Sequence, residues 1–73
     1  MHYKISNRTM MEYNADTGDL TIFSASDGRV LLELRIQSFH DANKIEEAIR
    51  TAENKAGEAA RVEMIGRVRS FYE

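Results

Sequence analysis

The chain of 73 residues contains no cysteine. Disulfide bonds are therefore excluded, and so are the thiolate ligands of the commonest structural zinc sites. A chain this short builds a core of only marginal stability, and small domains without disulfides or metals usually gain stability from a partner subunit. The absence of cysteine therefore favours an oligomer.

Long apolar runs are also missing, and the longest is Val30-Leu31-Leu32. A transmembrane helix needs about 20 apolar residues, so none is predicted, and the first part of the chain has no apolar segment typical of a signal peptide. The 10 basic and 12 acidic residues give a net charge of −2, which disfavours binding to duplex nucleic acid. We expect a single cytoplasmic domain over residues 1–73, with no membrane partner.

Motifs for catalysis or cofactor binding are absent as well. The sequence has no Gly-x-Ser-x-Gly elbow, and its four separate glycines form neither a Gly-x-Gly-x-x-Gly nor a Walker-type loop. His2 and His40 stand at no metal-ligand spacing. His40 precedes Asp41, but neighbouring helical residues do not face each other, so helix capping explains this pair better. We expect no enzymatic activity, no cofactor and no metal.

The first half of the chain, residues 1–37, predicts a three-stranded antiparallel β-meander. Apolar and polar residues alternate in three segments, and clusters of Asn, Asp, Ser and Gly separate them. The segment Tyr3-Lys4-Ile5 is either a short edge strand or part of an unordered start. The three expected strands are 9–13, 20–25 and 30–36.

The register of the second hairpin follows from burial. A three-residue loop over 26–28, with its glycine left-handed, pairs Ile22 with Leu32. The same register pairs Leu20 with Leu34, so four large aliphatic side chains share one face. A two-residue loop would place charged side chains opposite the apolar ones, and we therefore expect the first register.

The first hairpin leaves two registers open. A loop over 14–19 brings Met11 and Tyr13 to the same apolar face as the second hairpin. A tighter loop over 16–18 sends both side chains to the opposite face, because a shift of one residue reverses the direction of every side chain.

Residues 38–73 predict one long helix. Ser38 is expected to cap it, with Asp41 in its first turn beside the positive end of the helix. Apolar residues from Ile45 to Ala60 form one stripe at three- and four-residue spacing, and beyond Ala60 the stripe moves round by about 100°. The helix therefore either breaks near Gly57 or turns its C-terminal half toward a different surface.

A continuous helix of this length does not fit the predicted sheet. The helix would be about 50 Å long, whereas strands of seven residues make a sheet about 23 Å long. The excess must fold back at Gly57 or contact a second chain, and we predict the second chain. The expected fold is α+β: a three-stranded antiparallel meander followed by one long or Gly57-kinked helix, assembled as a homodimer or a higher oligomer.

Two sets of candidate binding residues follow from this arrangement. Apolar side chains on the second sheet face and on the C-terminal half of the helix are expected to bind a partner chain: Phe23, Leu31, Met64, Ile65, Val68 and Phe71. Arginines with an aromatic neighbour suit a small anionic nucleotide at a subunit interface, and the candidates are Arg61, Arg67, Arg69 and Tyr72. Small residues between 52 and 60 would let two helices pack closely.

These features predict a small, non-enzymatic, oligomeric protein–protein interaction module. Compact, acidic, cysteine-free proteins of this kind are frequent among phage accessory proteins, so our first expectation is a regulator or inhibitor of a larger machine. The alternative is a small-ligand binder that sequesters a nucleotide-like anion at the subunit interface.

Overall fold

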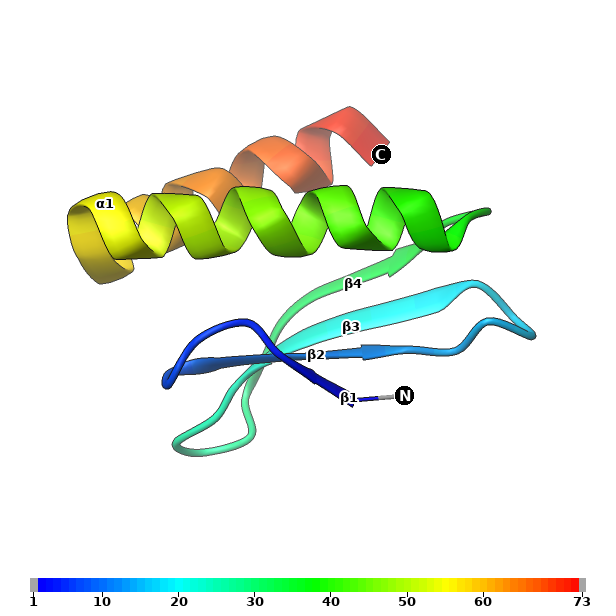
Figure 1. Ribbon diagram of the computed structural model, residues 1–73, viewed down its shortest axis with the longest axis horizontal. Helices are drawn as coiled ribbons and strands as arrows, with labels where there is room; N and C mark the ends of the chain where they lie inside the picture. Colours follow the sequence, from blue (N-terminus) through cyan, green and yellow to red (C-terminus); the bar gives the residue numbers. More distant parts are fainter. Residues whose placement is uncertain (1, 73) are drawn as a thin grey trace.

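The computed structural model describes residues 2–72 and confirms the α+β class, with a four-stranded antiparallel sheet and a helix, α1, on one face of it (Figure 1). Met1 and Glu73, the ends of the predicted domain, lie outside the described residues. The strands lie in the sheet in the order of the chain. The elements are β1 (His2–Lys4), β2 (Thr9–Tyr13), β3 (Asp19–Ser24), β4 (Val30–Arg35) and α1 (Phe39–Tyr72).

The sheet has four strands, so the prediction of three was wrong. The additional strand is β1, which pairs with β2 and sets Tyr3 opposite Met11. A segment of three residues carries little strand signal of its own. It is held by burial of Ile5 in the core and by Arg50 of α1, whose Nε donates a hydrogen bond to the Ile5 carbonyl at 2.9 Å. The contact to Arg50 comes from far along the chain, where a local pattern cannot reveal it.

The first hairpin adopts the register with the longer loop. The Asn14 amide donates to the Asp19 carbonyl at 2.9 Å, and Tyr13 of β2 lies opposite Leu20 of β3. Met11 and Tyr13 therefore point into the core, where both are almost completely buried.

The second hairpin keeps the predicted core register through a different turn. Leu20 pairs with Leu34 and Ile22 pairs with Leu32, as expected. The three-residue loop was wrong, because the Ser24 amide bonds to the carbonyl of Arg29 at 2.8 Å and leaves four residues in the loop. A bulge in β4, one residue before Leu32, then restores the register.

Helix α1 begins at the predicted cap and reverses direction at Gly57. The Asp41 amide donates to the Ser38 hydroxyl at 3.2 Å. A straight helix of 34 residues would be about 50 Å long, yet the longest dimension of the molecule is 32 Å. Gly57, with φ 80° and ψ −159°, divides α1 into a first arm (39–56) and a second arm (58–72), which lie side by side (Figure 1). The excess helix thus folds back onto its own chain instead of extending to a second one.

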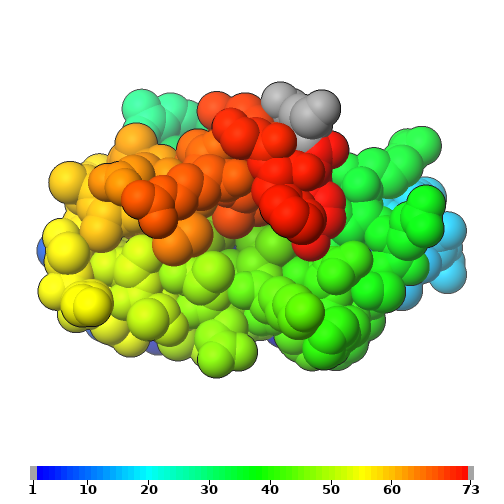
Figure 2. Space-filling model, turned by 90° about the horizontal axis from the view of Figure 1, so that it is seen from above, coloured from blue at the N-terminus to red at the C-terminus, as the bar shows by residue number. Residues whose placement is uncertain are grey.

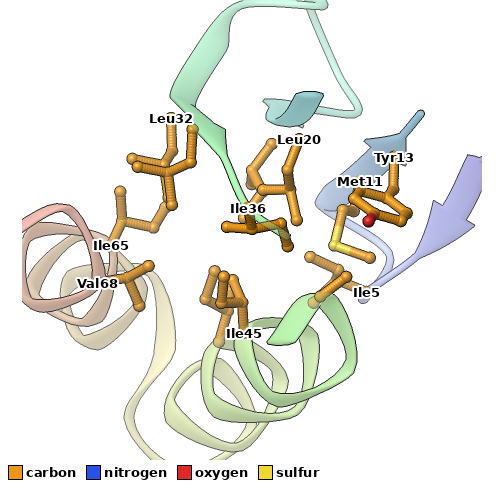
Figure 3. Close-up of a cluster of buried hydrophobic side chains, with 13 residues drawn as sticks. Ile5, Met11, Tyr13, Leu20, Leu32, Ile36, Ile45, Ile65 and Val68 are labelled. Atoms are coloured by element: carbon orange, nitrogen blue, oxygen red, sulfur yellow. The ribbon is translucent and has the colours of Figure 1, made fainter. Parts of the chain in front are cut away.

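Both arms of α1 bury their apolar faces on the same side of the sheet. Figure 3 shows Ile45 of the first arm and Ile65 and Val68 of the second arm among the side chains of the strands. The reversal explains why the apolar stripe changes direction after residue 60, because each arm turns a different side toward the sheet. The core consists of Ile5, Met11, Tyr13, Leu20, Ile22, Leu32, Leu34, Ile36, Ala42, Ile45, Ile49, Ile65 and Val68.

We expect Gly57→Ala to lower the free energy of unfolding by about 1–3 kcal/mol, because glycine alone adopts this backbone region at little cost. A Cβ atom at Gly57 would meet nothing within 4 Å, so the effect isolates backbone strain from steric clash. Gly66 is the matched control, since its Cβ would also meet nothing, and it lies within the second arm. Gly66→Ala should stabilise the protein by about 0.5–1 kcal/mol in denaturant unfolding. Equal stabilisation by both changes would contradict the reversal at Gly57.

Candidate functional site

The sheet has one face that α1 does not cover. Both arms lie on one side, and no element within residues 2–72 lies on the other (Figure 1). At the centre of this open face, Met10, Phe23 and Val30 form a cross-strand row, each opposite the next. Met10 and Phe23 are half-buried, and Val30 is 50% exposed. The open face therefore has an apolar centre.

Charged side chains border the apolar row of the open face. Glu12 and Glu33 stand on either side of Thr21 in the next row along the strands. At the end of the face, Arg35 Nε donates to Asp19 Oδ1 at 3.2 Å. The Thr17 hydroxyl and the Arg35 guanidinium lower the pKa of Asp19, which keeps this carboxylate charged. On β1, Lys4 lies opposite Met10 and His2 lies opposite Glu12, with His2 Nδ1 3.5 Å from Glu12 Oε2. The border of the open face is thus polar and carries charges of both signs.

Leu31 was predicted on the same face as Phe23, but the structure places it against the core. The bulge in β4 displaces Leu31, which is half-buried beside the core cluster. Its carbonyl accepts a hydrogen bond from Arg69 Nη2 at 2.9 Å. Met10 and Val30 take its place beside Phe23, and sequence reasoning missed both. The alternation in β2 shows that Met10 points away from Met11 and Tyr13. It could not show which of the two sheet faces Met10 lies on, because the register of the first hairpin was undecided.

The C-terminal residues predicted to reach a partner separate into two groups. Ile65 and Val68 are buried in the core of their own chain, because the second arm folds back over the sheet. Met64 is half-buried, and Phe71 is 80% exposed with its ring edge against Tyr72. Only Met64 and Phe71 of this group therefore offer surface to another molecule.

A groove of about 600 Å³ runs between the two arms on the side away from the sheet. Figure 2 looks onto this side and shows the arms next to each other. We term it the outer groove. Its apolar lining comes from Ala48, Ala52, Ala56, Ala60 and Met64, and its polar lining comes from Lys44, Glu47, Thr51, Lys55, Glu63 and Arg67.

The four residues predicted to bind a nucleotide-like anion do not meet in one place. Arg61 is buried near Thr9, and Arg69 lies on the carbonyl of Leu31. Arg67 and Tyr72 share a smaller hollow of about 220 Å³, but Arg67 is already paired with a glutamate at 2.7 Å. Burial, and then the nearby charge of Asp41, raises the pKa of Tyr72. The anion site stays a prediction, with Arg67 and Tyr72 as the members that lie together.

A buried ion pair that the sequence did not reveal joins the two arms to the turn between β1 and β2. The side chains of Arg61 and Glu53 are 4% and 8% exposed, and their charged atoms lie 3.8 Å apart. The Thr9 hydroxyl links them, since it donates to Glu53 Oε2 at 2.8 Å and accepts from Arg61 Nη1 at 3.0 Å. The Ser6 hydroxyl also donates to Glu53. Arg61 Nη2 also donates to Glu58 Oε1 at 3.2 Å, whereas the buried Arg61 Nε has no hydrogen-bond partner among residues 2–72. Because the Glu53 carboxylate and the Thr9 hydroxyl are satisfied within the cluster, we assign it a structural role.

Comparison of the chain with protein-family models, with curated proteins and with solved structures gives no match. Within residues 2–72, no group of three or more His, Cys, Asp or Glu side chains is arranged to hold a metal ion. In the same part of the chain, none of the helical structure is long and apolar enough to cross a membrane. The open face and the outer groove are therefore the two surfaces from which a function can be argued.

Proposed function

We propose that this chain is a small, non-enzymatic protein–protein interaction module that binds another protein through its open face. The observation that carries the proposal is the apolar row of Met10, Phe23 and Val30 at the centre of that face. The solvated face of an antiparallel sheet is usually polar. A contiguous apolar centre with a polar border is instead typical of a protein interface, in which Met and aromatic residues are enriched.

One position on the border of the open face, Glu33, favours a basic side chain on the partner. Glu33 lies beside the apolar row opposite the uncharged Thr21, whereas Glu12 lies between Thr21 and His2, whose Nδ1 is 3.5 Å from Glu12 Oε2. Complementary charge around an apolar centre sets the orientation of a partner and speeds its association. The proposed partner therefore presents an apolar patch with a Lys or Arg placed to meet Glu33, and a module of this size would act on it as a regulator or inhibitor.

We expect Val30→Glu to abolish partner binding, because it places a charge in the apolar row directly beside its central residue, Phe23. Val62→Glu is the matched control, since Val62 is a valine of similar exposure (58% against 50%) on the second arm of α1. Proteins captured from the source cells by the wild type and by Val62→Glu, but not by Val30→Glu, would be identified by mass spectrometry. Titration with the purified partner should then show a loss of about 30-fold or more for Phe23→Ala, as for a central interface residue.

A partner that binds Val30→Glu as tightly as the wild type would place the interface elsewhere and refute the proposal. Circular dichroism of each variant separates loss of binding from loss of the fold. Because Val30 is half exposed, its replacement should leave the unfolding transition nearly unchanged.

A further inference from the structure

The outer groove has a shape into which another helix fits closely. Its floor is made of the small side chains Ala48, Ala52, Ala56 and Ala60. Met64 of the second arm adds further apolar surface to the lining. Small side chains at a contact let two helix axes approach to the short end of the usual 8–10 Å range. The groove lies on the opposite side of the arms from the sheet, so a helix in it would not compete with the core.

The charges along the first arm complement a second copy of the same arm. Glu47 and Lys55 both line the groove, and Thr51 lies midway between them. A two-fold axis at Thr51 makes two first arms antiparallel, which places Glu47 opposite Lys55 of the second copy and Lys55 opposite Glu47 of the second copy. Each charge then lies four residues, or about 6 Å along the helix, from the axis. A parallel pairing would oppose like charges and is disfavoured.

Glu47 and Lys55 are free to form these contacts. Glu63 on the other side of the groove pairs with Arg67 at 2.7 Å. In contrast, Glu47 and Lys55 are exposed and make no ion pair with any of residues 2–72.

We propose that a second copy of this chain binds in the outer groove, with the two first arms antiparallel about Thr51. The dimer has four layers, in which two pairs of helical arms lie back to back and a sheet covers each side. The two open faces then point outward in opposite directions. This inference goes beyond the proposed function, because the groove and the open face lie on opposite sides of the molecule. The dimer would therefore hold two partner molecules, one on each of its outer sides.

The test uses charge reversal at the two rim positions. Glu47→Lys and Lys55→Glu each replace both reciprocal pairs of the dimer by like charges, so each variant should raise the dimer dissociation constant about tenfold or more. An equimolar mixture of the two variants restores opposite charges across the axis and should form a heterodimer. The double variant Glu47→Lys/Lys55→Glu should dimerise like the wild type. Light scattering over a concentration series, together with sedimentation equilibrium, measures all four samples.

Asn54→Lys is the control, because Asn54 is an exposed residue of the same arm that does not line the groove. It should dimerise like the wild type. A wild type that stays monomeric up to about millimolar concentration would overturn the proposal. If both charge-reversal variants dimerise like the wild type, the interface lies elsewhere and the proposal is overturned. The same conclusion follows if the mixture of the two variants does not dimerise. None of these measurements involves the partner of the open face, so their failure leaves the proposed function standing.

Discussion

Replacing Glu53 by alanine is expected to lower the free energy of unfolding by about 3–5 kcal/mol, because it leaves the buried guanidinium of Arg61 with only the exposed Glu58 as a counter-charge. The side chains of Glu53 and Arg61 are 8% and 4% exposed. The change also removes the acceptor for the hydroxyls of Ser6 and Thr9, which join the arms of α1 to the turn between β1 and β2. Urea unfolding followed by circular dichroism measures the loss.

Glu63→Ala is the matched control for Glu53→Ala. Glu63 also pairs with an arginine of α1, Arg67, but both side chains are about two-thirds exposed. A surface pair of this kind contributes at most about 1 kcal/mol. The double change Glu53→Met/Arg61→Met removes both buried charges and should be much less destabilising than Glu53→Ala alone. If Glu53→Ala and Glu63→Ala had the same small effect, the ion pair would not be buried as described.

Ile65→Ala is expected to lower the free energy of unfolding by about 2–5 kcal/mol, the range for removing most of a buried aliphatic side chain. Ile65 is 5% exposed and belongs to the core cluster between the second arm and the sheet. Val62 lies less than one turn away on the same arm and is 58% exposed. Val62→Ala should therefore change stability by less than about 0.5 kcal/mol.

The dependence of this loss on protein concentration distinguishes the two roles considered for Ile65. In the structure Ile65 packs on its own sheet, so the loss should be the same at every concentration. The sequence had predicted a contact with a second chain, and the loss from such a contact would be absent in the dilute monomer and would grow as the protein is concentrated enough to dimerise. A concentration-dependent loss would therefore return Ile65 to the interface and contradict the position of the second arm.

Local patterns in the sequence were sufficient to predict the structure of those strands and helix segments that bury one face. The alternation in β3 and β4 favoured the pairing of Leu20 with Leu34, because a slip of one residue exposes these side chains. The cap at Ser38 followed from the chemistry of a helix start, and it is present. The change in the apolar stripe after residue 60 correctly indicated two faces, and a break near Gly57 was one of its two explanations.

Contacts between distant segments account for what the sequence did not reveal. Strand β1 depends on Arg50, and the buried cluster depends on Glu53 meeting Thr9 across 44 residues. Neither contact produces a periodic pattern in the sequence from which it could be predicted. The bulge at Leu31 was missed because a four-residue loop followed by a bulge gives the same pairing in the core as a three-residue loop without one, and only the position of Leu31 differs. Leu31 was consequently predicted as the neighbour of Phe23 on the open face, where the structure has Val30.

The edges of the sheet have a consequence for the solubility of the protein. An edge strand with free amides and carbonyls is a template on which further strands can add, and this is how sheets grow into fibres. Strand β1 is only three residues long. Strand β4 is interrupted by its bulge, and Arg69 occupies the carbonyl of Leu31 at that point. Both edges are thus poor templates for strand addition, so association of this protein should produce closed assemblies rather than fibres.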